Sequence, residues 1–369
     1  MKRVCIVCDG IWEQLQGGAE YQLSLLADGL AARGYEVHYV YVNRGMEVRR
    51  SEIQLHALDV SSLVRRVFYP YQWLLWPQLS SRLRAIRPDV VINRVGNAIT
   101  GICAHYAKTT DTPMIWHVAN ITDLQRFRPP RGRTLPFSFL NKKLLEYGVR
   151  NATAIVTQAR YQSSMLEDRF ARHANAVIPN FHPGVEEALT SDRPYVLWVA
   201  NVKPRKQPEY FIRMVEMIGS TSDARFLLVG RAEHPRYEAE IQSRIKPIAN
   251  LEWCGELPIG HVNQLLAKSQ VFVNTSRFEG FPNTFIQAWQ REVPVVSLEF
   301  DPDGVLEQEG IGFHSRNLTR LCEDVLKLLK DPAQRQDIGR RASDYAAHHH
   351  GLKPNIDRYA QLIESLVKP

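Results

Sequence analysis

The sequence lacks the features of a membrane-spanning or disulfide-rich protein. No apolar stretch approaches the roughly 18 residues that a transmembrane helix needs, and the run from Met1 to Cys8 is too short for the hydrophobic part of a signal peptide. The cysteines are scattered, without the paired spacing of a disulfide framework: Cys5, Cys8, Cys103, Cys254 and Cys322. We therefore expect a cytoplasmic protein whose cysteines are free thiols.

Several ligand-binding signatures are also missing. No Gly-x-Gly-x-x-Gly follows the first predicted strand, which disfavours an NAD enzyme. Cys5 and Cys8 lie within that strand at an offset that points their side chains to opposite faces, and His348-His349-His350 has no second ligand cluster, so we expect no metal site. The sequence pI is about 9.1, but no zinc spacing or RNA-binding signature accompanies the charge, and we expect no nucleic-acid partner.

The composition is that of a folded protein with an uneven charge distribution. The chain has 369 residues, 44% of them hydrophobic, which is enough for two domains with separate cores. Residues 1–186 contain 23 Lys and Arg against 15 Asp and Glu, a balance of +8, whereas residues 187–369 contain 23 against 24, a balance of −1. The first half is predicted to meet an anionic partner, although a basic surface also serves simple solubility.

Short apolar segments alternate with helix-sized intervals along the whole chain, which predicts parallel sheets with helices on both faces. In the first half they lie at 4–7, 37–42, 90–92, 114–116 and 154–156; in the second half at 195–199, 226–229, 251–253, 271–273 and 293–296. A further strand is expected to end in turn residues over 177–184, and the polar stretch from there to Pro194 is interpreted as a linker. We expect domains at 1–186 and 187–350, and an amphipathic helix at 351–369 that returns to the first domain or ends the second.

The segment from Arg277 to Ala288 carries the clearest chemistry. A buried strand, a Gly/Pro loop and a helix starting at an Asn283 cap and running to about Arg291 follow one another, and Glu279 lies on the loop. Unpaired N–H groups at a helix start suit a phosphate, and a carboxylate can accept hydrogen bonds from sugar hydroxyls. Gln287 follows Glu279 by eight residues.

This spacing resembles the Glu-x7-Glu signature of family 4 of the retaining glycosyltransferases, the glycosyl transferases group 1, with Gln in place of the second Glu. The paired halves resemble the GT-B architecture, an α/β fold in which two Rossmann-like, doubly wound domains face each other across a cleft. The resemblance implies a retaining, hexosyl-type transferase that needs no metal or bound cofactor and moves a sugar from a nucleotide diphosphate sugar to a glycan or lipid-linked acceptor, as in polysaccharide biosynthesis.

The resemblance also assigns site residues. Lys206 matches the family lysine that meets the diphosphate, Asn201 stands where the family has an arginine, and Arg205 or Lys203 is expected to supply the second charge. His117 follows the strand at 114–116 and matches the histidine placed beside the transferred sugar. The predicted catalytic residues are therefore His117, Lys206 and Glu279, and the predicted donor-binding residues are Gly17, Gly18, Arg205, Gly230, Arg231, Gly280, Phe281, Pro282, Asn283, Thr284 and Gln287.

Alternatives remain for the activity. No carboxylate nucleophile stands out, so the resemblance implies front-face attack, in which the leaving phosphate takes the acceptor's proton. The replacements at Asn201 and Gln287 also suit a catalytically weak nucleotide-sugar-binding partner subunit. A sugar-nucleotide epimerase or hydrolase and a phosphorylase are further enzymes on this fold.

The acceptor side is expected in the basic first domain. Residues 65–76 mix aromatic and basic side chains, which suits an anionic membrane surface or a core helix with a charged outer face. The basic run 126–133 contains Pro and Gly and is predicted to be a loop over the acceptor. A peripheral position at the inner face of the membrane is therefore one possible location.

Overall fold

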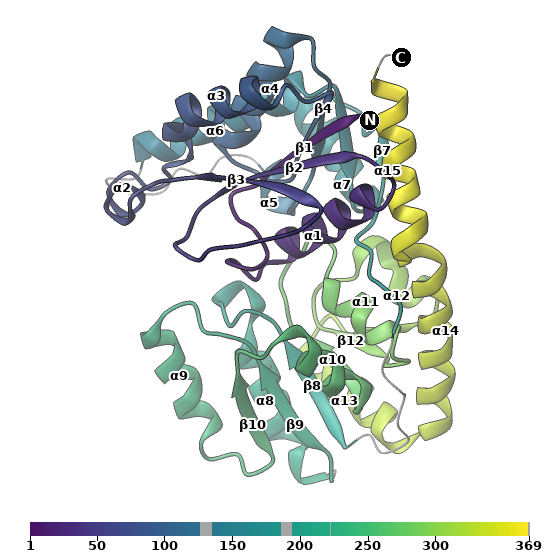
Figure 1. The fold of residues 1–369 in the computed structure, drawn as a ribbon. Coiled ribbons are helices and arrows are strands. Elements are labelled where there is room, and N and C mark those ends of the chain that lie inside the picture. The colour runs from purple at the N-terminus through teal and green to yellow at the C-terminus, as the bar shows by residue number, and fades with distance from the viewer. Residues whose placement is uncertain (126–134, 186–193, 222, 368–369) are drawn as a thin grey trace. The chain divides into compact units, whose positions relative to one another are not determined.

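The computed structural model describes residues 1–125, 135–185, 194–221 and 223–367. The chain forms two compact units (Figure 1). Unit 1 comprises Met1–Asn180 and Leu352–Pro369, and unit 2 comprises Phe181–Gly351. The predicted boundary at residues 186 and 187 and the predicted acceptor loop at 126–133 lie outside the described residues.

Unit 1 is built on a parallel sheet of seven strands in the order β3-β2-β1-β4-β5-β6-β7. The strands are β1 (Arg3–Val7), β2 (Glu36–Val42), β3 (Ile53–Leu58), β4 (Val90–Asn93), β5 (Met114–His117), β6 (Ala154–Thr157) and β7 (Ala176–Val177). The chain moves outward from β1 to β3, crosses back to β4 and continues in the other direction. The gap between β1 and β4 is therefore the topological switch point, where open sheets of this kind bind ligands at the carboxyl ends of the strands.

The helices of unit 1 pack around this sheet because most of them turn apolar residues toward the apolar side chains of the strands. The helices are α1 (Gly18–Ala31), α2 (Ser62–Val67), the 3-10 turn η1 (Gln72–Leu75), α3 (Trp76–Ile86), α4 (Ala98–Thr110), α5 (Ile121–Leu124), α6 (Leu135–Asn151), α7 (Arg160–Phe170) and α15 (Leu352–Leu366). Gly101 and Gly148 let α4 and α6 approach closely, since a Cβ at either position would fall within 3 Å of the other helix's backbone. The C-terminal helix α15 packs on α1, where Ile356 lies over Gly29 and Arg33 binds Asp357.

Unit 2 repeats the design with six parallel strands in the order β10-β9-β8-β11-β12-β13. Its strands are β8 (Tyr195–Val199), β9 (Arg225–Val229), β10 (Leu251–Gly255), β11 (Ser269–Asn274), β12 (Val295–Ser297) and β13 (Gly312–His314). Its helices are η2 (Pro204–Lys206), α8 (Pro208–Ile218), η3 (Gly219–Thr221), α9 (Pro235–Ile245), α10 (Ile259–Ala267), α11 (Asn283–Trp289), η4 (Pro302–Gly304), α12 (Val305–Gln308), α13 (Leu318–Lys330) and α14 (Pro332–His350). The switch point lies between β8 and β11.

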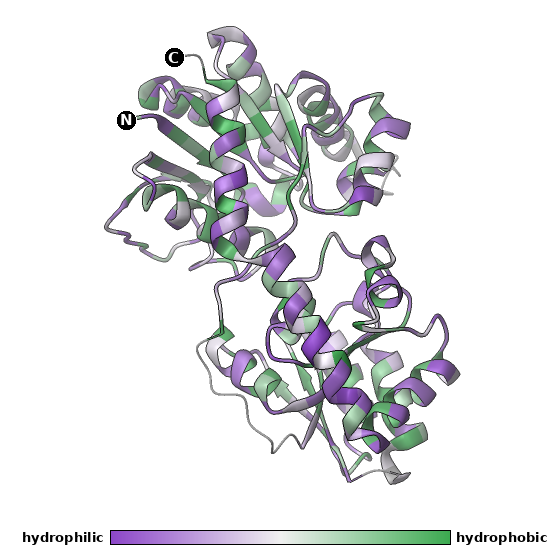
Figure 2. Cartoon of the chain, turned by 90° about the vertical axis from the view of Figure 1, so that its right-hand side faces the viewer, coloured by the Kyte–Doolittle hydropathy of each residue, from purple (hydrophilic) through white to green (hydrophobic). Residues whose placement is uncertain are grey.

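The predicted α/β class with two Rossmann-like halves is confirmed. Strand interiors are apolar in both sheets, and α15 carries both hydrophilic and hydrophobic turns (Figure 2). The edge strands β3 and β13 were not predicted, because polar residues such as His56 and His314 interrupt their apolar pattern. None of the described helices is long and apolar enough to cross a bilayer.

Two local predictions were wrong. Asn283 is not the cap of its helix: Pro282 occupies the N-cap position without a side-chain hydrogen bond, and the helix ends at Trp289 rather than near Arg291. Residues 65–76 do not form one core helix, since α2 stops at Val67 and the chain restarts at η1 after Pro70. Proline disfavours a helical conformation in the residue before it, which accounts for the break at Pro70.

Candidate active site

The switch point of unit 2 brings the main predicted donor residues together. Loops leave the carboxyl ends of β8 and β11, which are neighbouring strands, and carry Lys206 and Glu279 toward each other. The Lys206 ammonium donates a hydrogen bond to the Glu279 carboxylate in a buried ion pair. The two residues lie 73 positions apart in the sequence, and the order of the strands is what makes them meet.

The two loops are connected by a short chain of hydrogen bonds. Trp198 on β8 donates its indole N–H to Thr275 Oγ1 at 2.8 Å, and Thr275 donates in turn to the carbonyl of Lys206, also at 2.8 Å. The Arg277 backbone N–H donates to the Arg205 carbonyl at 3.1 Å. These bonds hold the Lys206 loop against the Glu279 loop independently of the ion pair.

Burial and pairing act on Lys206 in opposite directions. Its side chain is 13% exposed and that of Glu279 is 11% exposed. Burial lowers the pKa of Lys206, and the neighbouring Glu279 opposes that shift by favouring the ammonium form. A lysine ammonium has further N–H donors beyond the one used by Glu279, so the same group can also bind an anionic oxygen.

Gly230 and Arg231 follow β9, the next strand beside β8. Gly230 has φ +143°, and a Cβ there would lie 1.8 Å from the carbonyl oxygen of Ala200. Only glycine lets the ends of β8 and β9 come this close. The Arg231 side chain is 67% exposed and pairs loosely with Glu256 at 3.5 Å, so it stands at the edge of the loop cluster.

The remaining predicted donor residues lie on the β11–α11 loop and on α11. Gly280, Phe281 and Pro282 are buried, and Asn283 and Thr284 are half-buried. The Phe281 ring packs against Trp289 of α11 with a centroid distance of 6.2 Å, and this contact holds the loop against the helix. The Gln287 side chain is 5% exposed and donates to Asn263 Oδ1 on α10 at 2.9 Å.

In unit 1 the predicted residues follow different strands. Gly17 precedes α1 in an extended conformation at its N-cap, and Gly18 is the first residue of that helix. His117 ends β5 and is fully buried. Its Nδ1 is hydrogen-bonded to the Tyr359 hydroxyl of α15, while Nε2 has no partner among the described residues.

Burial and the nearby Arg94 hold the pKa of His117 well below its usual value, so the imidazole is neutral. The C-terminal helix thus positions this ring, which the sequence analysis did not foresee. The contact joins residues 242 positions apart, and only the packing of α15 onto unit 1 creates it.

Charged groups that were not predicted lie at the ends of β1 and β4. Arg94 follows β4, is 2% exposed and donates to Asn180 Oδ1. Asp9 follows β1 and accepts hydrogen bonds from Tyr71 and Gln72, and burial raises its pKa and that of Glu20 on α1. A charged residue directly after an apolar strand was the available signal.

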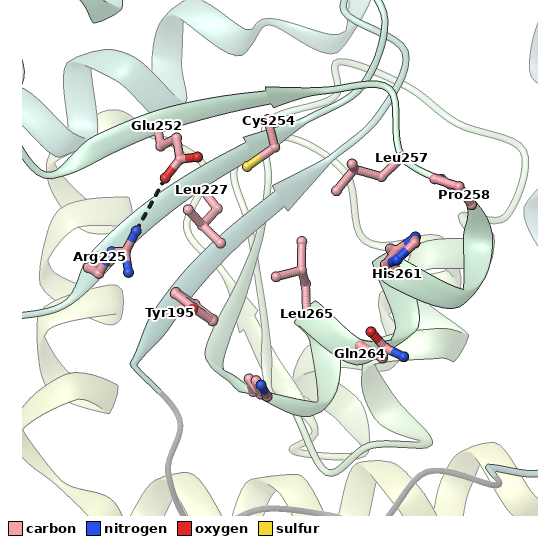
Figure 3. Close-up of a pocket in the computed structure, with 11 residues that line it drawn as sticks. Tyr195, Arg225, Leu227, Glu252, Cys254, Leu257, Pro258, His261, Gln264 and Leu265 are labelled. Carbon is pink, nitrogen blue, oxygen red and sulfur yellow. Dashed lines mark hydrogen bonds and ion pairs between the residues drawn. The ribbon is translucent and has the colours of Figure 1, made fainter.

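A cavity of 420 Å³ lies elsewhere in unit 2 (Figure 3). Tyr195 and Arg225 line it at the starts of β8 and β9, together with Cys254 of β10 and the face of α10 that carries His261 and Leu265. Arg225 pairs with Glu252 at 3.2 Å across its rim. None of the predicted donor residues lines this cavity.

A group of potential metal ligands occurs among the described residues at the ends of β12 and β13. Donor atoms of Asp301, Glu307 and His314 lie within 4.8 Å of one another. Glu307 is also ion-paired with Arg316, which holds the pKa of Glu307 below its usual value. Arg316 therefore already places a positive charge beside Glu307.

The chain matches two family models. "Glycosyltransferase Family 4" matches residues 16–182, and "Glycosyl transferases group 1" matches residues 193–331. A curated relative, glycosyltransferase 1 domain-containing protein 1 of Xenopus tropicalis, is 22% identical over 174 residues, which are 47% of this chain and 50% of that protein. The aligned part thus spans about half the length of that relative.

Solved structures resemble the chain over nearly its whole length. Sucrose-phosphate synthase of Thermosynechococcus elongatus superposes with a TM-score of 0.80 at 14% identity, covering 99% of both chains. HepE of Anabaena in complex with UDP-glucose gives 0.76 at 14% identity, covering 99% of this chain and 100% of that one. WaaG, a glycosyltransferase involved in lipopolysaccharide biosynthesis, gives 0.73 at 13% identity and covers 98% and 99%.

These likenesses establish the GT-B fold, and the two family models together span most of both units. The chain belongs to glycosyltransferase family 4, the glycosyl transferases group 1.

Proposed function

We propose that this glycosyltransferase moves a hexose from a nucleotide diphosphate sugar to a glycan or lipid-linked acceptor with retention of configuration. The observation that carries the proposal is the buried Lys206–Glu279 pair at the switch point of unit 2. A cation and a carboxylate side by side suit a ligand with a phosphate at one end and sugar hydroxyls at the other. HepE, a structural neighbour, was solved with UDP-glucose, which supports this donor class.

The reaction breaks the bond between the anomeric carbon and the diphosphate oxygen, and the acceptor oxygen forms the new bond on the same face. The acceptor's proton passes to the leaving phosphate, so no protein nucleophile is required. Lys206 stabilises the charge that develops on the diphosphate, with Arg205 as a second cation on the same loop. Glu279 keeps Lys206 charged and orients the sugar.

In unit 1, we assign His117 to the acceptor and transferred sugar. Its neutral imidazole has one nitrogen held by Tyr359, which leaves Nε2 to meet a substrate hydroxyl. A neutral imidazole nitrogen can donate or accept a hydrogen bond, depending on which nitrogen carries the proton. We further propose that the enzyme needs no metal or bound cofactor and acts in the cytoplasm.

The direct test is a thermal-shift screen against UDP-, GDP- and ADP-sugars, followed by calorimetry with the donor that stabilises the protein. A shift restricted to one base names the donor class, and Lys206→Ala should abolish it. Transfer measured with and without EDTA tests metal independence. Absence of any shift with all three donor classes would contradict the proposed donor site.

A second candidate is a catalytically weak subunit that binds the nucleotide sugar for a partner. Asn201 stands where the family has arginine, and Gln287 has its amide engaged with Asn263. Tight donor binding with neither transfer nor donor hydrolysis would favour this role. Conversion of the free donor without any acceptor would favour a sugar-nucleotide epimerase or hydrolase.

A further inference from the structure

We propose that unit 1 docks onto anionic lipid bilayers through a surface formed by α2 and the first turns of α6. We call it the α2–α6 surface, and it comprises Leu63, Arg66, Val67, Tyr69, Phe139, Leu140 and Lys143. Docking of this kind determines where the enzyme is held, and it does not depend on which sugar nucleotide unit 2 binds.

Exposed apolar side chains concentrate at this place. Among the described residues, Met1, Met46, Leu63, Val67, Tyr69, Phe139, Leu140 and Met217 are the exposed large hydrophobics, and five of these eight belong to the α2–α6 surface. Leu63 is 64% exposed, Tyr69 is 61% exposed and Phe139 is 52% exposed. Single exposed hydrophobics are ordinary on protein surfaces, but a contiguous group indicates a partner.

Each helix combines apolar and basic side chains on one exposed face. On α2, Leu63, Arg66 and Val67 occupy positions i, i+3 and i+4, which lie on the same side of a helix. On α6, Phe139 and Lys143 are four residues apart, and the Lys143 ammonium lies 5.3 Å from the Phe139 ring centroid. Both helices thus present hydrophobic groups with a cation beside them, the pattern of helices that lie in a membrane interface.

An aromatic cluster joins the two helices into one surface. Phe68, directly after α2, packs against Phe137 of α6 with ring centroids 5.6 Å apart. Trp73 of η1 stacks on the same Phe137 ring at 5.9 Å. Figure 1 shows α2 and α6 at the same end of unit 1. The exposed residues therefore belong to neighbouring segments held in a defined arrangement.

The charge of this region selects an anionic partner. Residues 60–88 contain Arg65, Arg66, Arg82, Arg84 and Arg87 but no Asp or Glu, and residues 136–145 contain Lys142 and Lys143 but no acidic residue. A nucleic acid would satisfy the cations but leave Leu63, Val67 and Leu140 in water. An anionic bilayer accepts both kinds of group, because its headgroups attract the cations while its interface buries the apolar side chains.

Flotation of the full chain with phosphatidylcholine vesicles, with and without phosphatidylglycerol, tests the proposal in the absence of any sugar nucleotide. We expect binding only to the anionic vesicles, weakening as salt is raised from about 0.05 to about 0.5 M. Arg66→Gln with Lys143→Gln should weaken partitioning by about fivefold for each cation removed. Leu63→Asn with Phe139→Asn should also weaken it, by about tenfold or more.

Matched controls come from unit 2. Met217→Asn removes an exposed hydrophobic residue of 52% exposure, and Arg340→Gln removes an arginine whose side chain is 69% exposed; neither should change flotation. All the variants should keep their donor-induced thermal shift, which separates this proposal from the proposed function.

Equal flotation of the wild type and both α2–α6 variants would overturn the proposal, as would vesicle binding that does not depend on phosphatidylglycerol. Loss of a dimer in the variants without a change in flotation would also overturn it, because the α2–α6 surface would then be a contact between copies of the chain. Binding of RNA in preference to anionic vesicles would overturn it as well.

Discussion

The two units share a topology but arrange their charged groups differently at their switch points. In unit 2, the ends of β8 and β11 carry a lysine paired with a carboxylate, and Arg205 stands on the same loop as the lysine. In unit 1, the ends of β1 and β4 carry the carboxylate of Asp9 and the buried guanidinium of Arg94, and the next strand, β5, ends in the neutral imidazole of His117. The fold therefore sets the place of each group of polar residues, and the loops set its chemistry.

Removing the cation of unit 2 should have the largest effect. Lys206→Ala leaves Glu279 buried without its ion-pair partner and takes away the charge that we propose for stabilising the leaving diphosphate. We expect kcat/KM to fall by about 10²–10³ and the free energy of unfolding to fall by about 2–3 kcal/mol. Steady-state kinetics and urea denaturation measure these two effects.

Lys203→Ala is the matched control, because Lys203 lies on the same loop but its side chain is 34% exposed and pairs with Glu233 at 3.6 Å. Lys203→Ala should change kcat/KM by less than about threefold, because surface ion pairs contribute little free energy. Equal losses in the two variants would show that the buried pair has no special role.

Acid should act on the two units with opposite sign. In unit 2, burial lowers the pKa of His182 to about 3, with Arg291 and His350 contributing. The folded state keeps this ring neutral while the unfolded chain takes up a proton, so its stabilisation is present above about pH 6.5 and lost as pH falls toward 3. Between about pH 7.5 and 5 the loss is about 2 kcal/mol, measurable by urea denaturation.

In unit 1, burial raises the pKa of Asp123 to about 6, so that its folded form binds a proton more readily than the unfolded chain. The Asp123 carboxyl favours folding at low pH and disfavours it as pH rises through 6.

The contribution of His182 can be tested by substitution. His182→Gln should reduce the acid sensitivity of unit 2, whereas His173→Gln, at a side chain that is 85% exposed, should not. Identical pH profiles for the wild type and His182→Gln would contradict the assignment.

The role of the C-terminal helix in unit 1 can be tested at Tyr359. Tyr359→Phe removes the hydroxyl that holds His117 Nδ1 while keeping the ring. We expect kcat to fall by about tenfold with unchanged donor affinity, because the imidazole loses its orientation and tautomer. Kinetics and calorimetry separate the two quantities.

Tyr35→Phe is the matched control, since its hydroxyl donates to Glu364 on the same helix at 2.8 Å but lies in an exposed contact. A loss of donor affinity in Tyr359→Phe, or an equal kcat loss in Tyr35→Phe, would show that α15 stabilises the unit rather than the ring.

The smallest effect is expected at Gln287 in unit 2. If this position meets the ribose hydroxyls, Gln287→Glu should tighten donor binding by about threefold, because a carboxylate makes charge-assisted hydrogen bonds. Calorimetry with the donor found by thermal shift measures the change. Unchanged or weaker binding would mean that the contact with Asn263 is the residue's main role.

Much of the fold could be predicted because the central strands are buried on both faces and their apolar runs are continuous, as at Val90–Asn93 and Tyr195–Val199. The edges were missed because β3 and β13 contain polar residues. Lys206 and Glu279 were found through a family spacing. Arg94 and Tyr359 carry no such spacing, and their roles depend on neighbours distant in the chain.

By itself, the sequence determined the two-unit α/β design, the glycine that lets β9 end beside β8, and the amphipathic last helix, since each follows from local periodicity or backbone freedom. Tertiary structure decided which polar groups meet. The strand orders bring Lys206 to Glu279, the packing of α15 brings Tyr359 to His117, and the aromatic contact at Phe137 joins α2 to α6. Those pairings arise from contacts between segments far apart in the chain, which local sequence patterns do not encode.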